Sequence, residues 1–162
     1  MILSAHAALG AAIGAATNCP AVAVPVALVS HLLLDSFPHA DIAHLVKPLE
    51  SGELSDEQPR WVPIVIGADL TISAIIILVG AILYPDRVWS IVLGGLVAIL
   101  PDFQYAPGFG PWLCRQFWYK PYEWLHERGH IHFPLTYAQR YWGYHPQILA
   151  LIGSILWLLR AA

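Results

Sequence analysis

The chain has 162 residues, of which 57% are hydrophobic and only 12% are charged, and its formal net charge is −3. Soluble proteins carry roughly 25% charged residues. Because a small domain keeps much of its surface exposed, a soluble domain of this size could not bury all these apolar side chains. The negative charge and the lack of a basic stripe with interleaved aromatic residues exclude a nucleic-acid partner. The composition indicates a single integral membrane domain over residues 1–162.

Five apolar segments are predicted to be helices. In chain order they cover residues 2–17, 20–37, 61–84, 88–106 and 146–160. A bilayer core needs about 20 helical residues, which the third and fourth segments supply, whereas the other three are short and would tilt or be shielded by their neighbours. The sequence therefore predicts an all-α fold, a polytopic bundle of about four to five transmembrane helices. A helical hairpin on the membrane surface is the alternative for the first two segments.

The first segment is unusually rich in small residues. Its alanines and glycines include Ala8, Gly10, Ala11, Gly14 and Ala15. In lipid, small side chains let two helix backbones approach closely, because little side-chain volume separates them. We therefore expect this segment to pack tightly against another helix.

Two long polar stretches separate the segments. Residues 38–60 are predicted to form an acidic loop. Residues 107–145 are rich in tryptophan and tyrosine, which favour the membrane interface, so one or two interfacial helices are expected near 111–131. If all five segments cross, both stretches lie on one side of the membrane. Most of the lysines and arginines fall on that side: Lys47, Arg60, Arg115, Lys120, Arg128 and Arg140. The positive-inside rule then predicts a multi-pass protein of the cell inner (plasma) membrane with both loops in the cytoplasm.

The ionisable side chains inside the segments share one membrane depth. With this topology they all lie toward the cytoplasmic end of their helices: His6, His31, Asp35, Asp69 and Asp102. Ionisable groups inside a membrane are rare and are usually paired or functional. The sequence thus predicts a polar pocket to which several helices contribute. His6, His31 and Asp35 are its candidate metal ligands, and Asp69 and Asp102 are further ligands or carboxylates that support the ligands.

His31 and Asp35 are four residues apart, so on a helix they share one face. An imidazole and a carboxylate at this spacing can bind one divalent metal, or a metal pair with help from other helices. Zinc is the first choice for a histidine-rich site, with manganese or iron as alternatives. A hydrogen-bonded His–Asp pair that neutralises both groups is the competing interpretation.

A second histidine cluster lies in the sequence LHERGHIHF at residues 125–133. His126, Glu127 and His130 match the short HExxH pattern, in which two histidines bind zinc and the glutamate is the general base. More broadly, His126, His130 and His132 are candidate metal ligands that complete the first cluster from the same side, or bind an anionic substrate. Solvated interfacial histidines stacked on Trp124 and Tyr122 are the alternative. After the second segment, His39, Asp41 and His44 are either further ligands at the mouth or a polar loop.

Three short motifs resemble those of bacterial inner-membrane proteins described as membrane-bound metal-dependent hydrolases. They are Ser4-Ala5-His6 with Gly10, the stretch SHLLLD at 30–35, and Leu100-Pro101-Asp102. The order of the motifs differs from that family, and Asp102 is followed by Phe-Gln-Tyr rather than by a second aspartate and a histidine. The resemblance implies metal binding more directly than it implies hydrolysis.

These observations favour a membrane-bound metal-dependent hydrolase with a His/Asp metal site at the cytoplasmic interface. Its expected partners are membrane lipid and a lipid-like ester or phosphoester substrate. Asp69, Asp102 and Glu127 are the candidate catalytic residues, and a divalent metal, zinc first, is the expected cofactor. The alternative is a non-catalytic integral membrane protein whose His/Asp network is structural, or binds or conducts ions.

Overall fold

The computed structural model describes residues 2–37, 62–106, 108–129 and 144–160. The helices are α1 (Leu3–Thr17), α2 (Pro20–Asp35), α4 (Val62–Leu83), η1 (Pro85–Arg87), α5 (Val88–Ile99), η2 (Leu100–Tyr105), α6 (Phe109–Cys114), α7 (Lys120–Gly129) and α9 (His145–Arg160). Within these ranges there is no strand. The predicted all-α class is therefore confirmed for the described part of the chain.

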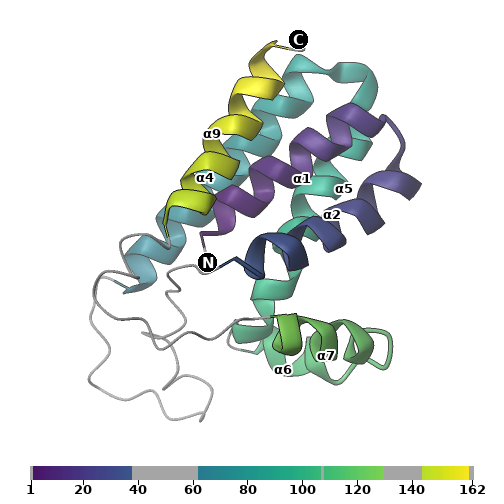
Figure 1. Cartoon of the computed structure of the whole chain (residues 1–162), viewed down its shortest axis with the longest axis vertical. Helices are drawn as coiled ribbons and strands as arrows, with labels where there is room; N and C mark the ends of the chain where they lie inside the picture. Colours follow the sequence, from purple (N-terminus) through teal and green to yellow (C-terminus); the bar gives the residue numbers. More distant parts are fainter. Residues whose placement is uncertain (1, 38–61, 107, 130–143, 161–162) are drawn as a thin grey trace.

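Helix α1 is the centre of the bundle and packs against α2, α4, α5 and α9 (Figure 1). Its closest neighbour is α5, because glycines face each other across the contact. A Cβ atom on Gly10 would lie 2.6 Å from the Cβ of Ala98, and one on Gly94 would lie 3.2 Å from the carbonyl carbon of Gly10. The small residues predicted to allow a close approach are all buried on α1. That expectation is confirmed.

The α1–α5 contact makes a testable prediction about stability. Gly94→Ala is expected to lower the free energy of unfolding by about 1–3 kcal/mol, because the added methyl group meets the backbone of Gly10. Gly67→Ala on α4 is the matched control, since its methyl group would have no atom within 4 Å. The control should be neutral or gain up to about 1 kcal/mol from helix propensity. Thermal unfolding in detergent checks the pair, and equal midpoints would contradict the packing account.

The ends of the helices bring distant residues to one end of the bundle. Helix α1 ends at Thr17 and is capped by Asn18, which has a left-handed φ of 48° and whose N–H donates to the Gly14 carbonyl. Pro20 starts α2 two residues after Asn18. Residues near the start of α1 therefore lie beside residues near the end of α2. Helix α5 returns to the same end and continues into η2, where Pro101 occupies the first turn.

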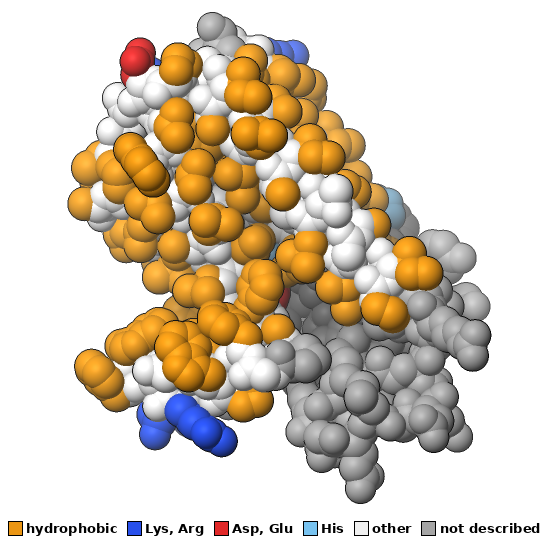
Figure 2. All heavy atoms as spheres, turned by 180° about the vertical axis from the view of Figure 1, so that it is seen from behind, with side chains coloured by type: hydrophobic (Ala, Val, Ile, Leu, Met, Phe, Trp, Pro, Cys, Tyr) orange, Lys and Arg blue, Asp and Glu red, His pale blue; other side chains and the backbone are white. Residues whose placement is uncertain are grey.

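Helix lengths give partial support for membrane spans. Among the described residues, only Pro63–Leu83 of α4 is long and apolar enough to cross a membrane, while α1, α2 and α9 are apolar but have 15 or 16 residues. The predicted fourth segment is divided, because α5 has 12 residues before η2 begins. Hydrophobic side chains are spread over much of the described surface seen in Figure 2. The large hydrophobic side chains that are exposed include those of Ile64, Leu78, Ile82, Trp89 and Leu149.

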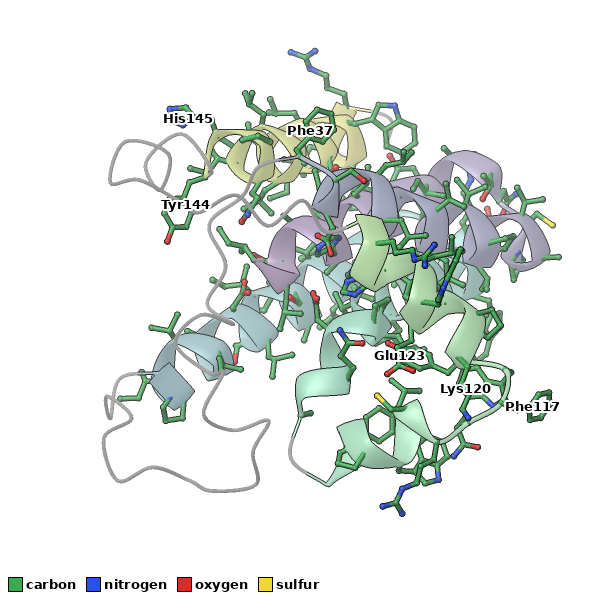
Figure 3. The ribbon with its side chains drawn as sticks, turned by 60° about the horizontal axis from the view of Figure 1, so that its bottom comes forward. Phe37, Phe117, Lys120, Glu123, Tyr144 and His145 are labelled. Carbon is green, nitrogen blue, oxygen red and sulfur yellow. The ribbon has the colours of Figure 1, made fainter. Side chains whose placement is uncertain are left out.

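Helices α6 and α7 lie across the end of the bundle, and we call residues 109–129 the α6–α7 arm (Figure 1). The predicted helices near 111–131 are confirmed by these two elements. Phe117, at the tip of the arm, is 85% exposed and points away from the bundle (Figure 3). Lys120 follows at the start of α7. The arm thus combines exposed aromatic and basic side chains at the end of the molecule where the buried histidines lie.

Candidate metal centre

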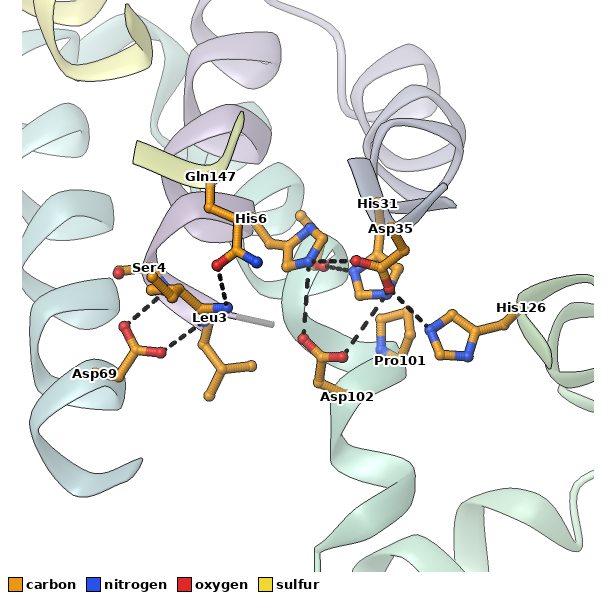
Figure 4. A network of polar contacts seen from close by, with 12 residues as sticks. Leu3, Ser4, His6, His31, Asp35, Asp69, Pro101, Asp102, His126 and Gln147 are labelled. Atoms are coloured by element: carbon orange, nitrogen blue, oxygen red, sulfur yellow. Dashed lines mark hydrogen bonds and ion pairs between the residues drawn. The ribbon is translucent and has the colours of Figure 1, made fainter. Parts of the chain in front are cut away.

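Five of the ionisable residues singled out from the sequence converge in space (Figure 4). His6 comes from α1, His31 and Asp35 from α2, Asp102 from η2, and His126 from α7. Four of them are buried, and only the Asp102 side chain retains an exposed fraction, 15%. The cluster therefore lies inside the protein, with Asp102 as its least buried member.

The Asp35 carboxylate is the centre of this cluster. Its Oδ1 lies 3.1 Å from Nε2 of His6, and its Oδ2 lies 3.0 Å from Nε2 of His31 and 3.1 Å from Nε2 of His126. The i,i+4 spacing of His31 and Asp35 on α2 thus brings their side chains together, as predicted. Asp102 faces the same group from the other side, 4.0 Å from His6 and 3.9 Å from His31.

The protonation of His31 follows from its second nitrogen. Nδ1 lies 2.7 Å from the Ala98 carbonyl, which only accepts hydrogen bonds, so Nδ1 carries the proton. That carbonyl lies in the last turn of α5, before Pro101, which has no N–H to donate. In the neutral ring, Nε2 then presents a lone pair to the Asp35 and Asp102 carboxylates. Such an arrangement requires a positive charge between the ring and the carboxylates, either a proton on Nε2 or a metal ion.

His126 is oriented by a chain of polar contacts from η2 and the arm. Nε2 of Gln104 lies 3.3 Å from Nδ1 of His126, and Oε1 of Gln104 accepts a 3.3 Å hydrogen bond from Tyr119. With the amide in this orientation, Nε2 of His126 carries the proton and donates to Asp35. If the amide is turned over, its oxygen accepts from Nδ1–H and frees Nε2 to bind a metal. A partner of this kind, behind the ligand, is typical of metal-binding histidines.

Tyr122 is a further polar residue beside the cluster. Its ring stacks on His126, with centroids 6.0 Å apart, and lies 6.4 Å from that of His31. The hydroxyl is buried and has no hydrogen-bond partner among the described residues. Burial, with the negative charges of Asp35 and Asp102, raises the pKa of Tyr122, so the phenol stays protonated and is a hydrogen-bond donor.

The spacing of the donor atoms suits metal coordination. One ligand atom each from His31, Asp35, Asp102 and His126 can be chosen so that all lie within 4.8 Å of one another. Ligands bound at about 2.0–2.2 Å from one ion are themselves about 3–4 Å apart, and the His31–carboxylate contacts of 3.0 and 3.9 Å fall in this range. The widest pair of the group, at up to 4.8 Å, needs only a small inward shift to share one ion. Imidazole and carboxylate are donors for zinc, manganese and iron. This buried His/Asp cluster can therefore hold a divalent metal.

Asp69 lies apart from this cluster and caps a helix. Its two carboxylate oxygens accept hydrogen bonds from the backbone N–H groups of Leu3 and Ser4, at 2.6 and 3.1 Å (Figure 4). Nearby, Oε1 of Gln147 accepts a hydrogen bond from the N–H of Ile2. Negative charge at a helix N-terminus is favourable because unpaired N–H groups and the helix dipole meet there. Asp69 thus anchors the first turn of α1, just before His6, and its predicted catalytic role stays a prediction.

Removing this cap is expected to weaken the fold. Asp69→Ala should lower the free energy of unfolding by about 0.5–2 kcal/mol, the usual effect of losing a capping side chain. Asp69→Asn keeps one carbonyl oxygen as an acceptor and should lose less. Thermal unfolding of both variants in detergent measures the effect. If Asp69→Ala melts with the wild-type midpoint, the two hydrogen bonds do not stabilise α1.

Several predicted site residues cannot be compared with the cluster. Glu127 follows His126 on α7, where the backbone is described but its side chain is not. His130 and His132 lie outside the described residues, as do His39, Asp41 and His44. The HExxH interpretation and the suggested rim of extra histidines therefore stay predictions.

Tyr122 and Gln104 are two residues of the site that were not predicted from the sequence. Tyr122 precedes His126 by four residues, so the helical spacing that linked His31 to Asp35 would also have placed Tyr122 beside His126. Gln104 had no comparable signal, because its contact with His126 depends on how η2 meets the arm.

Comparison of the chain with protein-family models, curated proteins and solved structures found no match. The residues of the cluster and their geometry therefore carry the functional proposal.

Proposed function

We propose that this protein is a membrane-bound metal-dependent hydrolase that acts on a lipid-like ester or phosphoester. The observation that carries the proposal is the convergence of three histidine Nε2 atoms on the carboxylate of one buried aspartate. A second carboxylate, Asp102, completes the donor set. Buried charges of this kind are costly unless they are paired or bind a metal.

The membrane location is supported by the exposed apolar surface. Helix α4 would be about 33 Å long, close to the hydrocarbon thickness of a bilayer, and it exposes Ile64, Ile75 and Ile82. Apolar patches of this extent on a monomer mark contact with lipid or with another protein. We propose a multi-pass arrangement in the inner membrane, in which the shorter helices tilt or are shielded by the bundle. The α6–α7 arm would then lie at the cytoplasmic interface.

The proposed metal is a divalent ion, zinc first, with manganese and iron as alternatives. His31, Asp35 and His126 would be its ligands, together with Asp102. Zinc accepts this mixture of imidazole and carboxylate, and so do the other two metals. The Ala98 carbonyl behind His31 and the Gln104 amide behind His126 would fix the orientation of the two rings.

When bound, such a metal would lower the pKa of a coordinated water and polarise the ester oxygen. The residues around it have complementary roles in this proposal. Asp102, the least buried of the cluster, would hold the metal on its less buried side, so its predicted catalytic role would be exerted through the metal. The Tyr122 hydroxyl is a neutral donor for a substrate oxygen. Asp69 and Glu127 are catalytic candidates on the evidence of the sequence alone. The proposed partner is membrane lipid.

The direct test measures hydrolysis by the purified protein in lipid vesicles. Fluorogenic phosphodiester and carboxylic-ester lipids are offered to chelator-treated protein, before and after addition of zinc, manganese or iron(II). Turnover should require metal and should be lost in Asp35→Asn, whereas the exposed His145→Ala control should retain it. Absence of metal-dependent turnover on every substrate would refute the hydrolase proposal.

A non-catalytic role is the second candidate, and a specific observation favours it. The His–Asp contacts at 3.0 to 3.1 Å are short enough to neutralise the buried groups by protons alone. The network would then hold α1, α2 and α7 together, or bind ions without chemistry. In that case His31→Ala should lower stability, and the metal content of the protein should not depend on His31.

A further inference from the structure

We propose that the cluster holds two divalent ions, and that His6 is a ligand of the second. This inference rests on the proposed metal-binding function and extends it. Two metals about 3.5–4 Å apart are a recurring arrangement in enzymes that cleave phosphate esters and related bonds. The geometry points to this arrangement through the way the two carboxylates share their oxygens.

Each carboxylate turns one oxygen to His6 and the other to His31. For Asp35, Oδ1 lies 3.1 Å from Nε2 of His6 and Oδ2 lies 3.0 Å from Nε2 of His31. For Asp102, Oδ2 lies 4.0 Å from His6 and Oδ1 lies 3.9 Å from His31 (Figure 4). Two carboxylates divided in this way are arranged as bridging ligands, with one oxygen for each of two adjacent ions.

The imidazole rings have a matching arrangement. His6 and His31 are stacked, with centroids 3.9 Å apart and planes inclined by 25°. Terminal ligands that lie side by side at this separation suit two neighbouring ions. His126 reaches the His31 side, because its Nε2 contacts the same Asp35 oxygen as His31 does. The first ion would thus have two histidines and the second would have His6.

The position of His6 distinguishes a site for two ions from a site for one. The four residues whose donor atoms group within 4.8 Å are His31, Asp35, Asp102 and His126. His6 is outside this group, yet it is 1% exposed and faces both carboxylates. A histidine that only supports Asp35 by a hydrogen bond is the competing explanation, and it predicts one ion rather than two.

Charge balance indicates which class of ligand would bind to the two metal ions. One divalent ion neutralises the two carboxylates, so a second ion brings two positive charges into a buried place. An anion that bridges both ions offsets this excess. We therefore expect the second ion to bind more weakly than the first, and inorganic phosphate, as the simplest phosphate-ester mimic, to strengthen its binding.

Titration of the purified protein in detergent with cobalt(II), with and without inorganic phosphate, tests the proposal. The wild type should bind two equivalents in phosphate, the second more weakly, whereas His6→Gln and His6→Ala should saturate at one. His145→Ala is the control and should bind two. Wild-type protein loaded with two equivalents of manganese(II) should give an exchange-coupled paramagnetic resonance spectrum. This measurement does not depend on whether the His6 variants fold.

The outcomes separate the two proposals. Saturation of the wild type at one equivalent, with and without phosphate, would overturn the second ion while leaving the metal site intact. Binding of two equivalents by folded His6→Ala would overturn the role of His6. Binding of no metal at all would refute the proposed function itself.

Discussion

Asp35→Ala is expected to abolish metal binding by this protein. The Asp35 carboxylate contacts Nε2 of all three clustered histidines at 3.0 to 3.1 Å, more of the candidate ligands than any other side chain in the described part of the chain. A metal present at about a hundred times its dissociation constant stabilises the folded state by about 2.7 kcal/mol. Adding zinc should therefore raise the melting temperature of the wild type and leave that of Asp35→Ala unchanged.

Asp86→Ala is the matched control for this prediction. Asp86 is an exposed aspartate in η1, where Arg87 contacts the Ala15 carbonyl at the opposite end of α1 from His6. The control should show the full zinc-induced rise. An equal rise in Asp35→Ala would mean that zinc binds elsewhere on the protein.

His126→Ala is expected to lower metal affinity by more than about 100-fold. Removing a residue that only hydrogen-bonds to a metal ligand typically lowers affinity by about 10–100-fold, and His126 is proposed as a ligand itself. His126 is the only member of the cluster that comes from the α6–α7 arm, while the others belong to α1, α2 and η2. Its loss leaves the bundle residues in place, so weak binding should persist. Competition with a chelating dye measures the affinity.

His145→Ala provides the comparison, because His145 is exposed at the first turn of α9 (Figure 3). It should bind metal like the wild type. If His126→Ala also kept wild-type affinity, the arm would contribute no ligand, and the site would belong to the bundle alone.

The helices could be predicted from the sequence because strong local signals mark where they begin and end. Apolar runs interrupted by Asn18, Pro20 and Pro101 left few other choices, and the small residues of α1 identified its tight contact with a neighbour. The division of the fourth segment into α5 and η2 was not predicted, although Pro101 marks the place. Membrane topology is a property of the lipid environment as well as of the chain, so it stays a proposal.

The candidate site could be predicted only from the depth of each residue in the membrane and from the helical spacing between residues. Aligning the segments in a membrane grouped His6, His31, Asp35 and Asp102, which the structure brings together. Asp69 shares their predicted membrane depth, but depth does not specify which direction a side chain faces around its helix. Asp69 instead meets the start of α1. The contact between Gln104 and His126 depends on tertiary packing and has no local signal.

The most direct test of a metal centre is the metal content of the purified protein. After mild purification and incubation with zinc or manganese, followed by removal of unbound ions, elemental analysis gives the number of ions per chain. We predict at least one ion per chain in the wild type and none in Asp35→Ala or His31→Ala. Wild-type protein that stays substoichiometric after incubation with either metal would contradict the account.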